Sequence, residues 1–283
     1  MKDKFCGWYF RAQSDAQTLA LIPALHTTQG ECTGSLQIIS DDGSRMIAFT
    51  GANLWVDKKR PRALLGQNLF SARGIRLAEK RADITLCGTL RFGRLSPIGY
   101  DIMGPFRYVP MMECRHSVIS MRHTVDGRIW LDGKEYRFQN ARGYIEGDRG
   151  CSFPRRYAWT QCFFENGSLM LSVADIPMGG ICFTGIIGVI RFGGKEYRLA
   201  TYLGARAVTI GGGRLEISQG DLSFTAALLE KNSFVLKAPK VGDMSRSIHE
   251  SLTCRAAYRF CIGGRTVLDF ETEKAAFEYE YPM

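Results

Sequence analysis

Two carboxylates and a phenol recur at every second position in one short stretch of the sequence. Because an extended chain points alternate side chains to the same face, Tyr144, Glu146 and Asp148 would lie side by side on a strand. Two carboxylates a few ångströms apart resist ionising together, which raises the pKa of one of them. We therefore expect a general-acid site here, with Glu146 or Asp148 as the proton donor.

The same stretch allows a structural alternative. Four arginines lie in or next to it and could pair with the carboxylates, which would cancel the rise in pKa: Arg142, Arg149, Arg155 and Arg156. Three glycines and a proline could fix an ion-paired β corner at this place: Gly143, Gly147, Gly150 and Pro154. From the residues alone, an acid site and an ion-paired corner both stay open.

A second candidate site lies in residues 103–117. Glu113 and His116 fall there among apolar side chains such as Phe106 and Met112. This composition is typical of a ligand pocket with a few polar groups. The alternative is a proline-bent strand on which His116 is a structural histidine.

The nine cysteines and four histidines show no metal-binding pattern. No two cysteines have the Cys-x-x-Cys spacing, and none lies at ligand spacing from the histidines, so we expect no metal site. The first ten residues lack the apolar core of a secretion signal, which favours a cytoplasmic protein with reduced thiols. The longest uncharged run, residues 176–190, is shorter than the roughly 18–20 residues that a membrane-spanning helix needs.

The chain carries 37 Lys and Arg residues against 28 Asp and Glu residues, a net charge of +9. One stretch is especially rich in these cations: Lys58, Lys59, Arg60, Arg62, Arg73, Arg76, Lys80 and Arg81. A solvated surface and a peripheral contact with an anionic membrane are both open for it. The sequence has no helix-turn-helix, zinc-finger or basic-helix pattern, so we expect no nucleic-acid partner.

Apolar and polar residues alternate over short runs, which is typical of half-buried β-strands. Asp126-Gly127 and Asp132-Gly133 separate three such runs, and both pairs predict type I′ hairpin turns because glycine accepts a positive φ. Helical periodicity is sparse, although residues 73–83 could form one or two helical turns. The pattern predicts an all-β chain of antiparallel strands with few helices.

The sequence also contains an internal repeat. Residues 129–138 and 190–199 share the frame Ile-x-x-x-Gly-Lys-Glu-Tyr-Arg, which indicates two similar β modules. We place the boundary near residue 150, with one barrel in residues 1–150 and a second in residues 151–283.

Residues 143–161 resemble the signature of the tocopherol cyclase family, which reads Tyr-x-Glu-Lys-Asn-Trp-Gly, then Phe-Pro, then Trp-x-Gln. The matching positions in this chain are Tyr144, Glu146, Phe153, Pro154, Trp159 and Gln161. Gly147, Asp148 and Arg149 replace the Lys-Asn-Trp of the signature, so an aromatic wall is lost and a second carboxylate is added. Similar stretches, including residues 7–10 and 103–106, extend the resemblance over nearly the whole chain.

The resemblance implies two lipocalin-like antiparallel β-barrels packed together, with an apolar ligand cavity. Members of this family close a chromanol ring on a prenylated hydroquinone. An acid protonates a trisubstituted alkene, and the phenol oxygen captures the tertiary cation. This chemistry uses no metal or redox cofactor, so no cofactor is expected.

The candidate site residues follow from these motifs. We expect Tyr144, Glu146 and Asp148 to be catalytic. The expected substrate contacts are Trp8, Tyr9, Glu113, His116, Arg149, Trp159 and Gln161.

Two functional hypotheses remain. The first is an enzyme that cyclises or hydrates an isoprenoid alkene in an apolar substrate of the prenylated quinol type. The second is a lipocalin-like carrier that binds an apolar small molecule and performs no chemistry.

Overall fold

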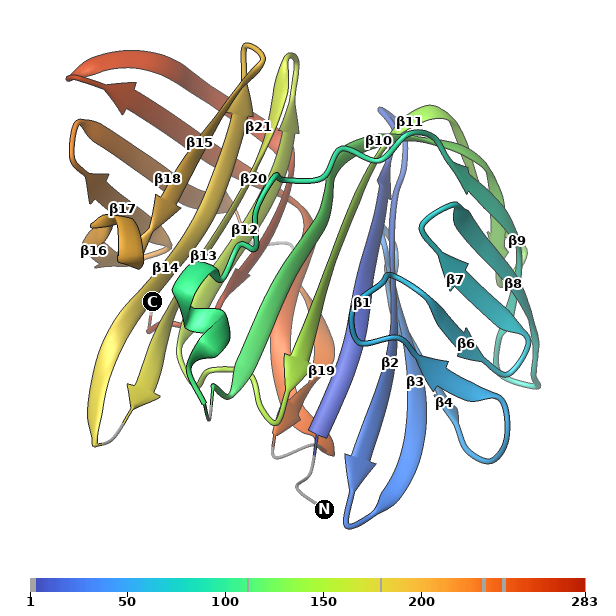
Figure 1. Cartoon of the computed structure of the whole chain (residues 1–283). Helices are drawn as coiled ribbons and strands as arrows, with labels where there is room; N and C mark the ends of the chain where they lie inside the picture. Colours follow the sequence, from blue (N-terminus) through green and yellow to red (C-terminus); the bar gives the residue numbers. More distant parts are fainter. Residues whose placement is uncertain (1–3, 111, 179, 231–232, 241–242, 283) are drawn as a thin grey trace. The chain divides into compact units, whose positions relative to one another are not determined.

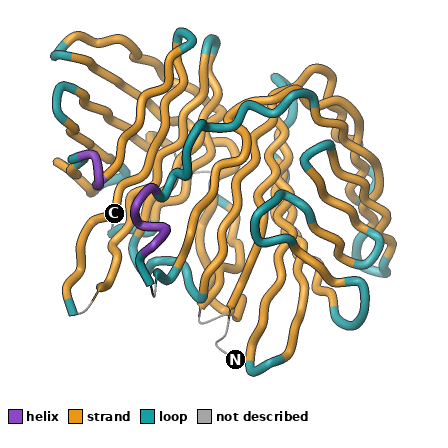
Figure 2. The backbone as a smooth tube through the Cα atoms, in the orientation of Figure 1, coloured by secondary structure: helices purple, strands orange, loops and turns teal. Residues whose placement is uncertain are grey.

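The computed structural model describes residues 4–110, 112–178, 180–230, 233–240 and 243–282. Antiparallel β-strands make up most of this part of the chain (Figures 1 and 2), and its helices are two short 3-10 turns, η1 (Gly104–Tyr108) and η2 (Thr201–Leu203). The all-β prediction is therefore confirmed. Within the described residues, neither helix is long and apolar enough to cross a membrane.

The chain divides into two compact units. The N-terminal unit contains residues 1–153 and 237–247, and the C-terminal unit contains residues 154–236 and 248–283. The returning segment is fixed to the N-terminal unit by a reciprocal amide contact. The side chain of Gln37 donates to the carbonyl of Lys237 at 2.9 Å and accepts from the backbone N–H of Lys237 at 2.8 Å.

An eleven-stranded sheet forms the N-terminal unit, in the order β4-β3-β2-β1-β11-β10-β9-β8-β7-β6-β5. Its strands are β1 (Lys4–Gln13), β2 (Thr18–Thr28), β3 (Glu31–Ser40), β4 (Gly43–Phe49), β5 (Leu54–Val56), β6 (Ala63–Leu65), β7 (Asn68–Ser71), β8 (Gly74–Lys80), β9 (Thr85–Phe92), β10 (Cys114–Leu131) and β11 (Lys134–Gly150). Because β5 and β6 return to contact β2 and β3, the sheet curls into a nearly closed barrel. Residues 74–80 are strand, so the predicted helical turns at 73–83 are wrong. Alternate apolar residues there, Ile75 and Leu77, point into the core.

One face of this sheet carries the barrel core. Trp8, Phe10 and Ile145 belong to that buried cluster, which also contains Phe70 and Leu90. Since side chains alternate along a strand, the residues between them on β1 and β11 point to the opposite face. This alternation decides which candidate site residues can meet.

The two Asp-Gly pairs behave differently. Asp132 and Gly133 have φ values of 50° and 84° and form the tight turn between β10 and β11, as predicted. Asp126 and Gly127 lie inside β10, where the register to β11 shifts, so the predicted second hairpin is wrong. Gly127 has a φ of 131°, and a Cβ there would lie 2.1 Å from the carbonyl oxygen of Thr89. The glycine therefore serves a β-bulge and a close backbone approach.

The C-terminal unit is built on a second antiparallel sheet, in the order β15-β14-β13-β12-β21-β20-β18-β17-β16, with β19 paired to β20. The strands of this sheet are β12 (Tyr157–Phe164), β13 (Gly167–Met178), β14 (Ile181–Phe192), β15 (Lys195–Ala200), β16 (Arg206–Gly211), β17 (Arg214–Gln219), β18 (Leu222–Glu230), β19 (Phe234–Lys240), β20 (Asp243–Ile262) and β21 (Arg265–Tyr279). The end of β19 and the start of β20 belong to the returning segment of the N-terminal unit. The internal repeat marks equivalent hairpins in the two units. Ile129 pairs with Tyr136 across β10 and β11, and Ile190 pairs with Tyr197 in the same register across β14 and β15.

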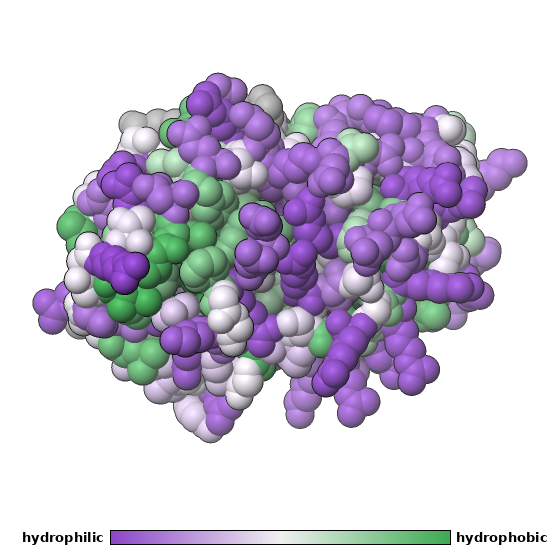
Figure 3. All heavy atoms as spheres, turned by 90° about the horizontal axis from the view of Figure 1, so that it is seen from above, coloured by the Kyte–Doolittle hydropathy of each residue, from purple (hydrophilic) through white to green (hydrophobic). Residues whose placement is uncertain are grey.

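One end of the C-terminal core reaches the surface. Phe164, Phe192, Ile262 and Phe270 lie near hairpin ends and are only partly buried against the core. The ring of Phe164 lies 6.2 Å from that of Phe192 and 5.1 Å from that of Phe270. Figure 3 looks down on this end and shows apolar side chains gathered at the surface there.

Candidate active site

Strands β1, β11 and β10 position the candidate acid residues. Glu146 on β11 lies opposite Tyr9 on β1, and Asp148 lies opposite His116 on β10. Directly opposed residues of antiparallel strands point to the same face. Tyr144 follows the same alternation, so five of the expected site residues share the face of the sheet that points away from the barrel core.

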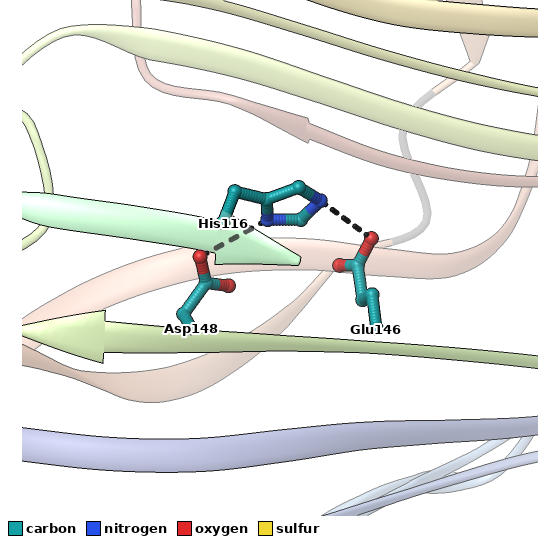
Figure 4. A group of neighbouring side chains, drawn as sticks. All are labelled: His116, Glu146 and Asp148. Atoms are coloured by element: carbon teal, nitrogen blue, oxygen red, sulfur yellow. Dashed lines mark hydrogen bonds and ion pairs between the residues drawn. The ribbon is translucent and has the colours of Figure 1, made fainter. Parts of the chain in front are cut away.

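His116 lies between the two carboxylates (Figure 4). Its Nδ1 is 3.0 Å from Oδ1 of Asp148, within hydrogen-bond distance. Its Nε2 is 3.2 Å from Oε2 of Glu146, an ion-pair contact that lacks the alignment of a hydrogen bond. Tyr144 donates its hydroxyl to the same Oε2 at 2.6 Å, and the thiol of Cys114 donates to Oδ1 of Asp148 at 3.3 Å. The five side chains form one connected row.

Burial increases along this row. The side chain of Asp148 is 24% exposed, that of His116 10% and that of Glu146 6%. Tyr144, at the end, is fully buried. Water therefore reaches the row most readily at Asp148. Glu146 and Tyr144 form the buried end of the row.

The two carboxylates control the charge of His116. Burial lowers the pKa of this ring, but attraction to Glu146 and Asp148 outweighs burial and holds the pKa well above its usual 6.5. At neutral pH the ring is therefore an imidazolium that carries a proton on each nitrogen. The histidine supplies the positive charge that lets two carboxylates lie close together.

The outer members of the row keep their protons as well. Burial, reinforced by the neighbouring Glu146, raises the pKa of Tyr144 well above 10. Burial, reinforced by Asp148, raises the pKa of the Cys114 thiol well above 9. The phenol and the thiol are therefore hydrogen-bond donors to the carboxylates at physiological pH.

The same three central residues have the composition of a metal site. Ligand atoms of His116, Glu146 and Asp148 lie within 4.8 Å of one another. The imidazole, however, lies between the carboxylates, and each of its nitrogens faces a different one. Each histidine nitrogen already faces a carboxylate, so a metal ion bound here would have to replace at least one of these two imidazole–carboxylate contacts.

Two expected substrate contacts lie on the other face of the sheet. Trp8 packs in the barrel core, and its Nε1 donates to the carbonyl of Asp57 at 2.9 Å. Arg149 donates to the carbonyl of Lys58 at 2.8 Å. Both residues hold the loop between β5 and β6, so the structure does not bring them to Glu146.

The remaining three expected contacts, Glu113, Trp159 and Gln161, lie outside the paired strands β1, β10 and β11. Glu113 precedes β10, and its carbonyl accepts the backbone N–H groups of Cys151 and Ser152, while burial raises the pKa of its carboxyl. Trp159 and Gln161 are buried on β12 of the C-terminal unit. They lie on the face of β12 opposite Ala158 and Cys162, which belong to the core of that unit.

Two of the four arginines near the carboxylates take other partners. Arg142 pairs with Asp15 at 2.7 Å, and Arg149 binds a backbone carbonyl as described. β11 continues as one strand to Gly150, so the alternative β corner is not found within residues 143–150. Gly147 instead leaves room for a ring, because a Cβ there would lie 2.3 Å from the indole of Trp8.

Sequence reasoning missed two residues of this face. Cys114 contacts Asp148, and its place two residues before His116 on a strand could have revealed it. Arg11 is 2% exposed and lies opposite Tyr144. A charged residue inside the apolar run of β1 was the available signal.

The fold and the site together define a two-unit, lipocalin-like antiparallel β protein with a buried carboxylate–imidazole row. Residues 77–183 match the family model described as tocopherol cyclase-like, which confirms the resemblance over that segment. The matched segment includes His116, Tyr144, Glu146, Asp148, Trp159 and Gln161.

Solved structures share this fold over nearly the whole chain. The crystal structure of kievitone hydratase from Nectria haematococca is 8% identical with a TM-score of 0.56, and the alignment covers 98% of this chain and 89% of that one. A putative AttH protein from Nitrosomonas europaea is 11% identical with a TM-score of 0.57, covering 99% and 93%. At these identities the likeness shows a common fold. The comparison with curated protein sequences found no significant match.

Proposed function

We propose that this chain is a cyclase- or hydratase-type enzyme that protonates an isoprenoid alkene in an apolar substrate of the prenylated quinol type. The observation that carries this proposal is the placement of His116 between Glu146 and Asp148 on a buried face. The match of residues 77–183 to tocopherol cyclase-like proteins supports the reaction class.

In the proposed reaction, Glu146 delivers the proton. The His116 ring first turns so that its Nε2–H points at Oε2 of Glu146, which lies 3.2 Å away in the structure. The proton then moves to that oxygen, and the resulting carboxylic acid protonates the less substituted alkene carbon. A tertiary cation forms on the neighbouring carbon, and in the proposed reaction the rings of Tyr9 and Tyr144, which share the face of Glu146, stabilise it. An apolar surrounding keeps water from the cation until the intended oxygen attacks.

The reaction ends with the return of one proton. In cyclisation the substrate phenol oxygen bonds to the cation and loses its proton, which passes back to the row through Glu146. In hydration a water molecule attacks and loses a proton in the same way. Neither route changes the oxidation state of the substrate. Asp148 and His116 hold the proton before the reaction, and the proton released at the end returns to His116. Trp159 and Gln161 stay proposed substrate contacts of the C-terminal unit.

The test is incubation of the purified full chain with a prenylated hydroquinone, followed by mass spectrometry. Cyclisation gives an isomer of the substrate, and hydration adds one water. Glu146→Gln should lower turnover by about 10²–10⁴-fold, the usual contribution of a general acid. Glu135→Gln is the matched control because it removes an exposed carboxyl of the same strand, β11, that lies outside the row. Equal turnover in wild type and Glu146→Gln would refute the proposed role.

A carrier function is the second candidate, and a separate observation favours it. The partly exposed rings of Phe164, Phe192 and Phe270 at one end of the C-terminal core could admit an apolar molecule. A carrier would release its ligand unchanged. Native mass spectrometry would then find a bound apolar molecule whose mass is the same before and after incubation, and whose retention falls in Phe164→Ala.

A further inference from the structure

The outer face of the N-terminal barrel carries a lateral row of apolar and cationic side chains. Trp55 pairs with Leu64, Leu64 with Leu69, and Leu69 with Arg76 across β5, β6, β7 and β8. Their chain neighbours Val56, Ala63, Leu65, Phe70 and Ile75 belong to the core. The four residues therefore point outward together, and Trp55 is 42% exposed and Leu69 39%. We call these four residues the Trp55 row.

Cations lie next to this row. The guanidinium of Arg62 lies over the Trp55 ring at 5.3 Å from its centroid. Lys58, Lys59 and Arg60 are exposed in the same β5–β6 loop. The exposed apolar residues thus have a positively charged border.

The loop that carries the cations is held firmly. Asp57 accepts the backbone N–H groups of Lys59 and Arg60 at 2.8 and 3.1 Å. The carbonyl of Asp57 accepts the Trp8 indole N–H, and the carbonyl of Lys58 accepts Arg149. A surface whose backbone is already ordered loses less entropy when it binds a partner.

Nearby carboxylates neutralise only part of this charge. Asp57, whose carboxylate also accepts the loop backbone, attracts Arg60 and Arg62, but Lys58, Lys59 and Arg76 are exposed cations as well. Glu79 pairs with Arg81 at 2.7 Å and accepts from Asn68 at 2.8 Å. The border of the Trp55 row therefore keeps an excess of positive charge.

From this arrangement we infer that the Trp55 row and the β5–β6 loop dock on an anionic lipid bilayer. Trp and Leu side chains enter the interfacial layer of a bilayer, and tryptophan prefers that depth. Lys and Arg beside them attract anionic head groups. Nucleic acid fits less well, because a single exposed tryptophan with two leucines provides no series of stacking rings. This inference is independent of the proposed chemistry.

The test is sedimentation of the full chain with vesicles of phosphatidylcholine alone or with about 30% phosphatidylserine, whose negative surface attracts basic segments. The protein should sediment with the anionic vesicles, and added salt should release it. The double variant Lys59→Ser with Arg60→Ser should weaken binding about 25-fold, since each cation near the surface contributes about fivefold. Trp55→Ser should weaken binding by about tenfold through lost apolar burial.

The matched control is Lys195→Ser with Arg265→Ser, two exposed hairpin cations of the C-terminal unit. It removes the same charge from residues that belong to neither the Trp55 row nor the β5–β6 loop, so vesicle binding should stay within about twofold, since only cations at the membrane surface add to it. Equal losses in both double variants would overturn the assigned surface. If the protein does not sediment with anionic vesicles, the proposal that a bilayer is the partner is wrong. The same holds if the protein is retained on an RNA oligonucleotide and not on the vesicles.

Discussion

The Nε2 atom of His116 lies 3.2 Å from Oε2 of Glu146, while Nδ1 of the same ring is occupied by Asp148. One imidazole from β10 thus connects two carboxylates that are neighbours on one face of β11. This connection turns a like-charge pair into a group that holds a proton between its members. The proposed chemistry depends on it.

Stability should fall on the alkaline side because of His116. The folded state raises the pKa of this ring above its unfolded value near 6.5, so its contribution is complete below pH 6.5 and is lost as pH rises through the folded pKa. Chemical denaturation as a function of pH should show this decline in wild type. His116→Gln should be less stable at neutral pH and should lack the decline. A decline of equal size in the variant would assign the effect to another group.

His123 should produce the opposite dependence. Burial lowers the pKa of this ring from 6.5 to about 4, and its Nδ1 lies 3.0 Å from the hydroxyl of Ser120. The unfolded chain therefore takes up a proton first, and stability is lost as pH falls from 6.5 toward 4, by about 3 kcal/mol. His123→Gln should flatten this acid limb in the same denaturation series. An unchanged acid limb would mean that His123 is already charged in the folded protein.

Gly147 should resist substitution even though its backbone is ordinary strand. A Cβ at this position would lie 2.3 Å from the Trp8 ring, so Gly147→Ala should destabilise the protein by about 1–3 kcal/mol through overpacking. Gly211→Ala is the matched control, because nothing lies within 4 Å of a Cβ at that strand position. Thermal unfolding compares the two variants. Equal stability would show that Trp8 shifts freely.

Cys114 should react slowly with alkylating agents. Its raised pKa keeps the thiol protonated near pH 8, whereas Cys32, Cys87 and Cys182 are exposed. Iodoacetamide labelling followed by peptide mass spectrometry should modify the exposed cysteines first. Asp148→Asn removes one cause of the raised pKa and should speed the labelling of Cys114. Labelling of Cys114 at the rate of Cys32 in wild type would contradict the assigned environment.

The alternating pattern was sufficient to place Tyr144, Glu146 and Asp148 on one face, because side-chain direction on a strand follows from sequence alone. Their contact with His116 was not predictable in the same way. It depends on the register between β10 and β11, and β10 contains three register shifts, one of them at the Asp126-Gly127 pair that suggested a hairpin. A one-residue slip would have turned His116 to the other face.

The same dependence on strand pairing explains why the prediction that Trp8 and Arg149 contact the substrate beside Glu146 is not met. Both belong to motifs that resemble the tocopherol cyclase family, but alternation turns them toward the core and the β5–β6 loop, away from Glu146. Resemblance identified the segment of interest, and only the paired strands separated the residues that face the row from those that support it. The all-β fold itself was accessible because hairpin glycines and short alternating runs are local signals.

The central claim is that Glu146 protonates the substrate with a proton held by His116. The most direct measurement is turnover of a prenylated hydroquinone by the full chain in D2O, with the product analysed by mass spectrometry. The proposed mechanism predicts a product that carries one carbon-bound deuterium, formed by wild type and Glu135→Gln and nearly absent in Glu146→Gln. A product without deuterium, or one formed equally well by Glu146→Gln, would contradict it.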